Sequence, residues 1–201
     1  MRQLARRPIG TVVLVLACAC TAAPLAVEPP AATALVRGVV RGDGRPRRDV
    51  VVWLEGARRT ARPEPAVVTM DQRNLAFLPH VLAVAVGTRV EMPNNDRVFH
   101  NVFSFKDGKR FDLGLYPSGT AKSVTFDRPG VSRLFCNIHP AMAGYVVAVD
   151  ADFFAVTDAD GRFEMPDVPE GAVTYHAWRA GEPVRTGPYT VGGGVLTIEW
   201  P

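Results

Sequence analysis

Short apolar runs, separated by turn-forming residues, recur along the chain from about residue 35 to its end. None of them shows the helical spacing of apolar positions at i, i+3 and i+4. Glycine, proline, aspartate and asparagine follow most runs, which is typical of strands joined by tight turns. The predicted strands are residues 35–41, 50–54, 81–86, 89–92, 99–105, 121–126, 131–136, 144–149, 154–157, 163–165, 173–178 and 195–200. This spacing predicts an all-β protein built as a sandwich or barrel.

Residues 1–20 follow a different pattern, which is that of a secretory signal peptide. Three arginines precede residue 8, and the apolar run 9–19 is too short to span a bilayer. Cys18 follows Val-Leu-Ala, which resembles a bacterial lipoprotein box and predicts that lipidated Cys18 tethers the protein to the membrane. Cleavage near Ala19 or Ala23, giving a soluble product, is the alternative. Both alternatives predict an exported, periplasmic protein.

The charge balance argues against nucleic acid as a partner. The chain has 23 Lys and Arg against 20 Asp and Glu. Removal of the signal takes away three arginines and no acid, which leaves 20 against 20. No strong positive field survives to attract a polyanion.

Cys136 is the one cysteine of the three that lies beyond the signal region. It therefore has no partner for an internal disulfide, and a free thiol in an oxidising compartment is a liability unless it is buried or bound to metal. The loop that it opens sets Cys136, His139 and Met142 at C-x2-H-x2-M spacing, and His100 stands 36 residues upstream of Cys136. One Cys, two His and a weak Met form the ligand set of a blue-copper electron-transfer site.

Two alternatives use the same residues. Cys136 could be a small buried apolar residue beside histidines that bind nothing. The Cys136–His139 pair could belong to a zinc site, although zinc sites normally use several Cys and His and rarely a thioether. The joint pattern favours copper, because soft sulfur favours Cu(I) while imidazole accepts either oxidation state. We therefore expect one copper ion, held by His100, Cys136, His139 and Met142.

Further short motifs surround these residues in the segment 66–150. They are Phe77-x-Pro79, Val84-x-x-Gly87-x-x-Val90, Asn94-Asn95, His100-Asn101-Val102 and the Cys136 loop. Together they resemble the cupredoxin family, and the loop spacing is similar to that of amicyanin and of cupredoxin-like proteins of methylamine utilisation. The resemblance implies a Greek-key sandwich of two sheets over residues 66–150, with copper at one end.

The resemblance also implies roles for residues beside the ligands. Asn101 would tie the ligand strands together and donate towards the Cys136 sulfur. His139 would reach the surface through an apolar patch, and a redox protein partner would dock there to exchange electrons.

His80 is a candidate for a role beside the ligands or in docking. A hairpin turn at Gly87-Thr88 would bring His80 level with Asn94 and Asn95, at the copper end. An ordinary polar role at the start of a strand is the favoured alternative.

Two flanking segments, 34–60 and 151–201, share a pattern of their own. Residues 38–46 with 50–54 resemble the start of a carboxypeptidase regulatory-like domain, and residues 157–163 with 168–171 resemble its second half. The resemblance implies a second, small transthyretin-like β-sandwich made from both flanks, with the cupredoxin inserted between them. The alternative is that both flanks extend the cupredoxin sheets.

The predicted function is single-electron transfer in the periplasm by Cu(II)/Cu(I) cycling, without catalysis. A module that stores or delivers copper, with no redox partner, is the alternative. A copper enzyme such as a nitrite reductase would need a second copper, commonly held by three more histidines. Only His80 and His176 remain, so one chain cannot supply that site, and we expect no enzyme activity.

Overall fold

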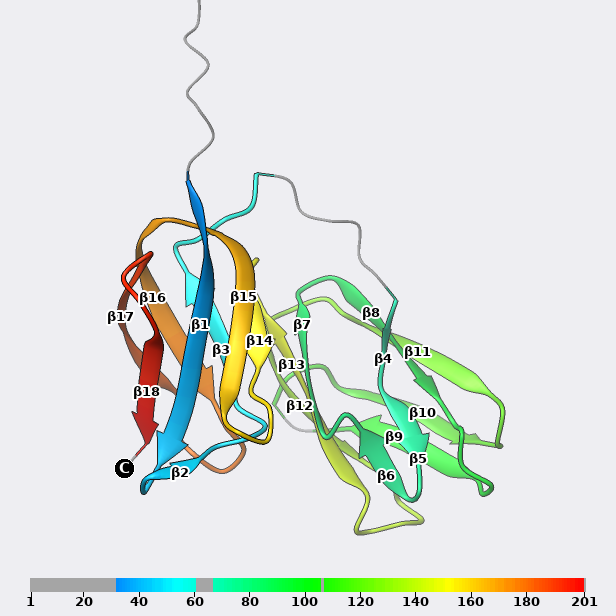
Figure 1. The fold of residues 1–201 in the computed structure, drawn as a ribbon. Coiled ribbons are helices and arrows are strands. Elements are labelled where there is room, and N and C mark those ends of the chain that lie inside the picture. Colours follow the sequence, from blue (N-terminus) through cyan, green and yellow to red (C-terminus); the bar gives the residue numbers. More distant parts are fainter. Residues whose placement is uncertain (1–31, 61–66, 106, 201) are drawn as a thin grey trace, which may run out of the picture. The chain divides into compact units, whose positions relative to one another are not determined.

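The computed structural model describes residues 32–60, 67–105 and 107–200, and every regular element within them is a β-strand (Figure 1). The all-β prediction is confirmed, since the strands form two sets of stacked sheets. In the described part of the chain, no helix is long and apolar enough to cross a membrane. The predicted signal peptide, with Cys18, lies outside the described residues.

The central domain contains a five-stranded sheet, a three-stranded sheet and a small hairpin. The five-stranded sheet has the order β10 (Phe111–Tyr116), β9 (His100–Ser104), β12 (Gly130–Phe135), β13 (Ala143–Val149) and β7 (Val81–Ala85). The three-stranded sheet has the order β11 (Ala121–Phe126), β8 (Thr88–Pro93) and β4 (Val68–Thr69). The hairpin pairs β5 (Asp71–Arg73) with β6 (Ala76–Leu78).

Strands from the two flanks pair with one another. One sheet has the order β15 (Arg162–Pro169), β1 (Thr33–Gly42) and β18 (Leu196–Trp200), with β2 (Arg45–Pro46) paired to β1. The other has the order β14 (Phe154–Val156), β3 (Val51–Glu55), β16 (Gly171–Trp178) and β17 (Arg185–Val191). β1 is antiparallel to β15 and parallel to β18, so residues before and after the central domain share one sheet. Their likeness to carboxypeptidase regulatory-like domains stays a prediction.

Alternation along the strands of the central domain builds its core. In β12, Ser132 and Leu134 point inward and are fully buried, while Arg133 between them is exposed. The same period of two places Cys136, just past the strand, at the end of this core. The core therefore delivers the thiol to one end of the sandwich.

β13 serves two cores at once. Val146 and Ala148 belong to the core of the central domain, whereas Val147 and Val149 pack in a second cluster with Val51 of the flank strand β3. Both faces of this strand are buried, which is why its sequence is apolar throughout rather than alternating.

The hairpin predicted at Gly87-Thr88 is wrong. β7 lies in the five-stranded sheet, parallel to β13, and β8 lies in the three-stranded sheet, antiparallel to β11. Gly87, with φ of 92°, lets the chain cross from one sheet to the other instead of pairing back on itself. His80 is therefore not brought level with Asn94 by strand pairing.

Candidate metal centre

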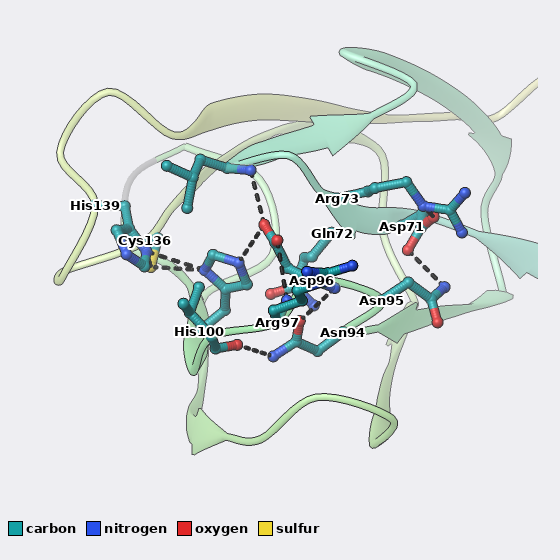
Figure 2. Close-up of polar contacts among 12 residues, drawn as sticks. Asp71, Gln72, Arg73, Asn94, Asn95, Asp96, Arg97, His100, Cys136 and His139 are labelled. Carbon is teal, nitrogen blue, oxygen red and sulfur yellow. Dashed lines mark hydrogen bonds and ion pairs between the residues drawn. The ribbon is translucent and has the colours of Figure 1, made fainter.

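His100, Cys136 and His139 come together at one end of the central domain (Figure 2). The Cys136 sulfur lies 3.8 Å from His100 Nδ1 and 3.6 Å from His139 Nδ1, and the two Nδ1 atoms are 3.0 Å apart. His100 and Cys136 are buried, and His139 is partly exposed. One soft sulfur and two imidazole nitrogens thus converge, which is the donor chemistry that suits copper in either oxidation state.

Sheet pairing and a short loop position these three side chains. Phe135, the residue before Cys136, pairs with Phe103 of β9, so the end of β12 runs beside the strand that begins at His100. Beyond Cys136 the chain turns, and the Met142 N–H donates to the His139 carbonyl at 2.9 Å. This bond closes the loop and fixes His139 opposite His100.

Asp96 is a site residue that the sequence reasoning missed. Its Oδ2 lies 3.1 Å from Nε2 of His100, whose side chain is fully buried, and it also accepts the Leu75 N–H at 2.8 Å. The backbone N–H of Leu75 is the main cause that lowers the pKa of Asp96, so this carboxyl is ionised at neutral pH. The only signal in the sequence is an acid four residues before a histidine, which is too common to be informative.

The Asp96 carboxylate decides which nitrogen of His100 is free. An ionised carboxylate accepts hydrogen bonds only, so Nε2 must carry the proton that it donates to Asp96. The lone pair then lies on Nδ1, which is the atom that faces Cys136 and His139. Carboxylates orient metal-binding histidines in this way in many sites.

Asn94 holds the loop that carries Asp96. Its side chain is fully buried and donates to the carbonyls of Val98, at 2.8 Å, and Tyr116, at 3.1 Å. Its Oδ1 accepts the Asp96 N–H at 3.0 Å. The loop is therefore tied both to itself and to β10, and Asp96 is preorganised against His100.

Asn101 ties β9 to the Cys136 loop. Its Oδ1 accepts the N–H of Asn137 at 2.9 Å, which joins the residue after His100 to the residue after Cys136. Its side-chain amide donates to Asp112 Oδ1 at 3.1 Å. The bond of this amide is to Asp112, and the donation towards the Cys136 sulfur that the resemblance implied stays a prediction.

Met142 is buried and belongs to the same apolar core as Cys136. Its place after the loop fits an axial ligand, and that role stays a prediction.

His80 lies outside the group formed by His100, Cys136 and His139. Its Nδ1 is 3.3 Å from Asp49 Oδ2, and its ring meets Tyr145 edge-on at 5.6 Å. Neither Asp49 nor Tyr145 is a candidate ligand, so these contacts do not support the predicted role of His80 beside the ligands. The strand pairing that would have brought it there is not formed, since β7 and β8 belong to different sheets.

Exposed apolar side chains flank both histidines along the chain. Phe99, directly before His100, is 55% exposed, and Ile138, directly before His139, is 45% exposed. The apolar patch around the partly exposed His139 that the resemblance implied stays a prediction.

The segment that carries the three candidate ligands matches the model of a known protein family. Residues 65–149 match the model of the copper binding proteins of the plastocyanin/azurin family. No curated protein gives a significant match.

Solved structures also resemble the central part of the chain. A purple cupredoxin from Nitrosopumilus maritimus is 26% identical, with 41% of this chain and 99% of that chain covered and a TM-score of 0.38. A copper-containing nitrite reductase from Thermus scotoductus SA-01 is 28% identical, with 46% of this chain and 24% of that chain covered and a TM-score of 0.41. An amicyanin variant in the reduced state is 23% identical, with 50% of this chain and 99% of that chain covered and a TM-score of 0.37. By the family match, the segment that carries His100, Cys136 and His139 is similar to the copper binding proteins of the plastocyanin/azurin family.

Proposed function

We propose that this protein carries single electrons on one copper ion, held by His100, Cys136 and His139 with Met142 as a weak axial ligand. The observation that carries the proposal is the convergence of one thiol and two imidazole nitrogens at a mostly buried point. A bound copper would supply the reversible Cu(II)/Cu(I) couple. The C-x2-H-x2-M spacing supports an amicyanin-like carrier within this family.

The surroundings of the site suit electron transfer because they resist rearrangement. His100 is held from behind by Asp96, and the loop after Cys136 is held by Asn101. Ligands fixed in this way change little between two oxidation states, which keeps the cost of reorganisation low.

His139 is the proposed exit for the electron. Its ring is the partly exposed member of the three, and Ile138 beside it offers an apolar contact. A redox protein partner that docks on this face would approach the ligand edge directly.

Storage or delivery of copper is the second candidate function. It predicts ready release of the ion to a chelator, whereas burial of His100 and Cys136 favours retention. An additional copper site of the kind an enzyme would need is not supported by the remaining histidines. His80 lies against Asp49 and His176 against Glu55, so they do not gather in one place.

Copper titration with optical and electron spin resonance spectra tests the proposal. The protein should bind one copper and show an intense blue Cu(II) form that a mild reductant bleaches. Cys136→Ala should abolish the colour, while the matched His80→Ala variant should keep it. Retained colour in Cys136→Ala would refute the ligand assignment, and fast loss of copper to a chelator would favour delivery.

We also propose that the protein is exported to the periplasm, and that Cys18 is lipidated. The support is the sequence of residues 1–20 alone. Labelling of the protein with a radioactive fatty acid, and its loss in Cys18→Ala, would test the tether.

A further inference from the structure

A second surface feature lies apart from the metal centre. A groove of about 1070 Å³ is lined by residues of the central domain and of the flank, among them Arg110, Arg128, Arg133, Tyr145 and Trp178. We refer to these five residues as the arginine groove. It is open and wide, and its volume reaches the upper end of the range for small-molecule sites, roughly 300–1,000 Å³.

None of the three guanidinium groups forms a close ion pair with a carboxylate among the described residues, although Lys109 and, less strongly, Arg128 lower the pKa of the neighbouring Asp127. Arg110, Arg128 and Arg133 are all exposed. The hydrogen bond of Arg128 is to the carbonyl of Gly108, at 3.5 Å, and Arg133 lies over aromatic rings.

Several other arginines of the chain do form close ion pairs. Arg37 pairs with Glu164 and Arg73 with Asp71. One acid, Asp107, lines the groove against three arginines, so it carries a net positive charge. Three arginines outnumber the acid in the lining, and this excess of positive charge favours an anionic partner.

The groove also has an apolar wall. The rings of Tyr145 and Trp178 meet edge-on at 5.4 Å, and the guanidinium of Arg133 lies 5.8 Å from the Tyr145 ring. Val184 on the same wall is 47% exposed. Exposed apolar surface next to unpaired arginines is typical of a protein-binding site, in which aromatic residues and arginines are enriched.

A second cavity adjoins the arginine groove. This cavity of about 400 Å³ shares Val131, Trp178 and Val184 with it and extends as far as Trp53 and His176. Two adjoining cavities with charges on different residues suit an extended chain better than a compact ligand. A small anion would need buried donors that converge on one point, and here all three guanidiniums are exposed and come from separate segments.

We infer that the arginine groove binds an acidic polypeptide segment of a partner protein, with carboxylates on Arg110, Arg128 and Arg133 and an apolar side chain against Trp178. Guanidinium–carboxylate contacts would give specificity and speed of association, and the aromatic wall would add burial. None of the residues that line this surface is a candidate copper ligand, and its binding does not require copper.

Fluorescence anisotropy of a labelled hexaglutamate peptide tests the inference. The wild-type protein should bind it, with affinity that falls as salt is raised, and should not bind hexalysine. A peptide with a leucine among the glutamates should bind more tightly, and Val184→Ser should reduce that gain. The combined variant Arg110→Gln, Arg128→Gln, Arg133→Gln should bind about tenfold or more weakly, since it loses all three exposed charge pairs together.

The control removes three exposed arginines elsewhere, with Arg37→Gln, Arg73→Gln and Arg162→Gln combined. It changes the net charge equally and should leave binding within about twofold. Equal loss in both triple variants would mean that only overall charge matters, and unchanged binding in the groove variant would place the peptide elsewhere. Complete displacement of the peptide by millimolar inorganic phosphate would overturn the polypeptide assignment in favour of a small-anion site. The blue colour of the copper-loaded groove variant should match wild type, which separates this test from that of the metal centre.

Discussion

Asp96→Asn is the sharpest test of how the protein tunes its candidate metal centre. The replacement removes one negative charge and keeps the shape of the side chain. Oδ2 of Asp96 accepts from both His100 Nε2 and the Leu75 N–H, and an amide oxygen in the same place can accept both. The other oxygen accepts the N–H of Arg97, an exposed residue whose amide can turn to water instead. The variant therefore changes charge far more than geometry.

Coulomb's law gives the size of the effect. Asp96 Oδ2 is 3.1 Å from His100 Nε2, and one imidazole ring separates it from an ion on Nδ1, so the charges lie about 7 Å apart. At an effective dielectric constant of about 20, loss of one charge at that distance is worth about 2.4 kcal/mol. A one-electron couple shifts by about 59 mV for each 1.4 kcal/mol, so the limit is about 100 mV. Because the Asp96 side chain is 16% exposed, water screens part of this, and we expect a rise of about 50–100 mV.

Spectroelectrochemical titration of the copper-loaded protein measures this shift. The potential should rise, because a nearby negative charge stabilises Cu(II) over Cu(I). The matched control is Asp71→Asn, which removes an equal charge from a residue that pairs with Asn95 and Arg73, away from the three candidate ligands (Figure 2). An unchanged potential in a blue Asp96→Asn protein, or an equal shift in Asp71→Asn, would refute the reasoning.

Three further predictions concern the two cores and the axial position. Burial raises the pKa of Tyr116 from 10.0 to about 12, so the free energy of unfolding should fall by about 2–3 kcal/mol between pH 10 and pH 12. Denaturant titrations of Tyr116→Phe should lose this alkaline decline. Near neutral pH the variant should be less stable by about 1 kcal/mol, because it loses the hydrogen bond to the Met92 carbonyl. Gly38→Ala should destabilise the flank sandwich by about 1–3 kcal/mol, because the new Cβ would lie 2.1 Å from the buried Phe163 ring; an unchanged midpoint would mean that the ring moves aside freely. Met142→Gln should keep copper but lower the potential, and an unchanged potential would remove the axial assignment.

The convergence of the metal centre could be predicted because it follows from local patterns. Strand alternation sends Cys136 into the core after Leu134, and a three-residue spacing puts His139 within reach. His100 lies far from Cys136 in the sequence, at the first residue of β9.

Asp96 could not be predicted, because its partners are joined by tertiary structure. The Leu75 N–H that lowers its pKa comes from a hairpin turn more than twenty residues away along the chain. Leu75 itself has a positive φ of 57°, which is an unfavourable backbone conformation for a leucine. The residue type therefore gives no indication that the turn places its N–H there. The role of Gly87 could not be predicted either, since a glycine with positive φ serves both a hairpin and a crossing between sheets.

The apolar run of β13 shows that the central domain and the flanks depend on each other. Val146 and Ala148 fill the central core, but Val147 and Val149 would face water in an isolated central domain. In the full chain they are nearly inaccessible, and Val51 of β3 packs in the same cluster. Each buried valine contributes about 1.5–3 kcal/mol relative to an exposed one. The central segment cut out at residues 66–150 should therefore be less stable than the full chain, and Val147→Ser with Val149→Ser should rescue its solubility while weakening the full protein. The flanks are thus part of what holds the strand whose neighbour, β12, delivers Cys136.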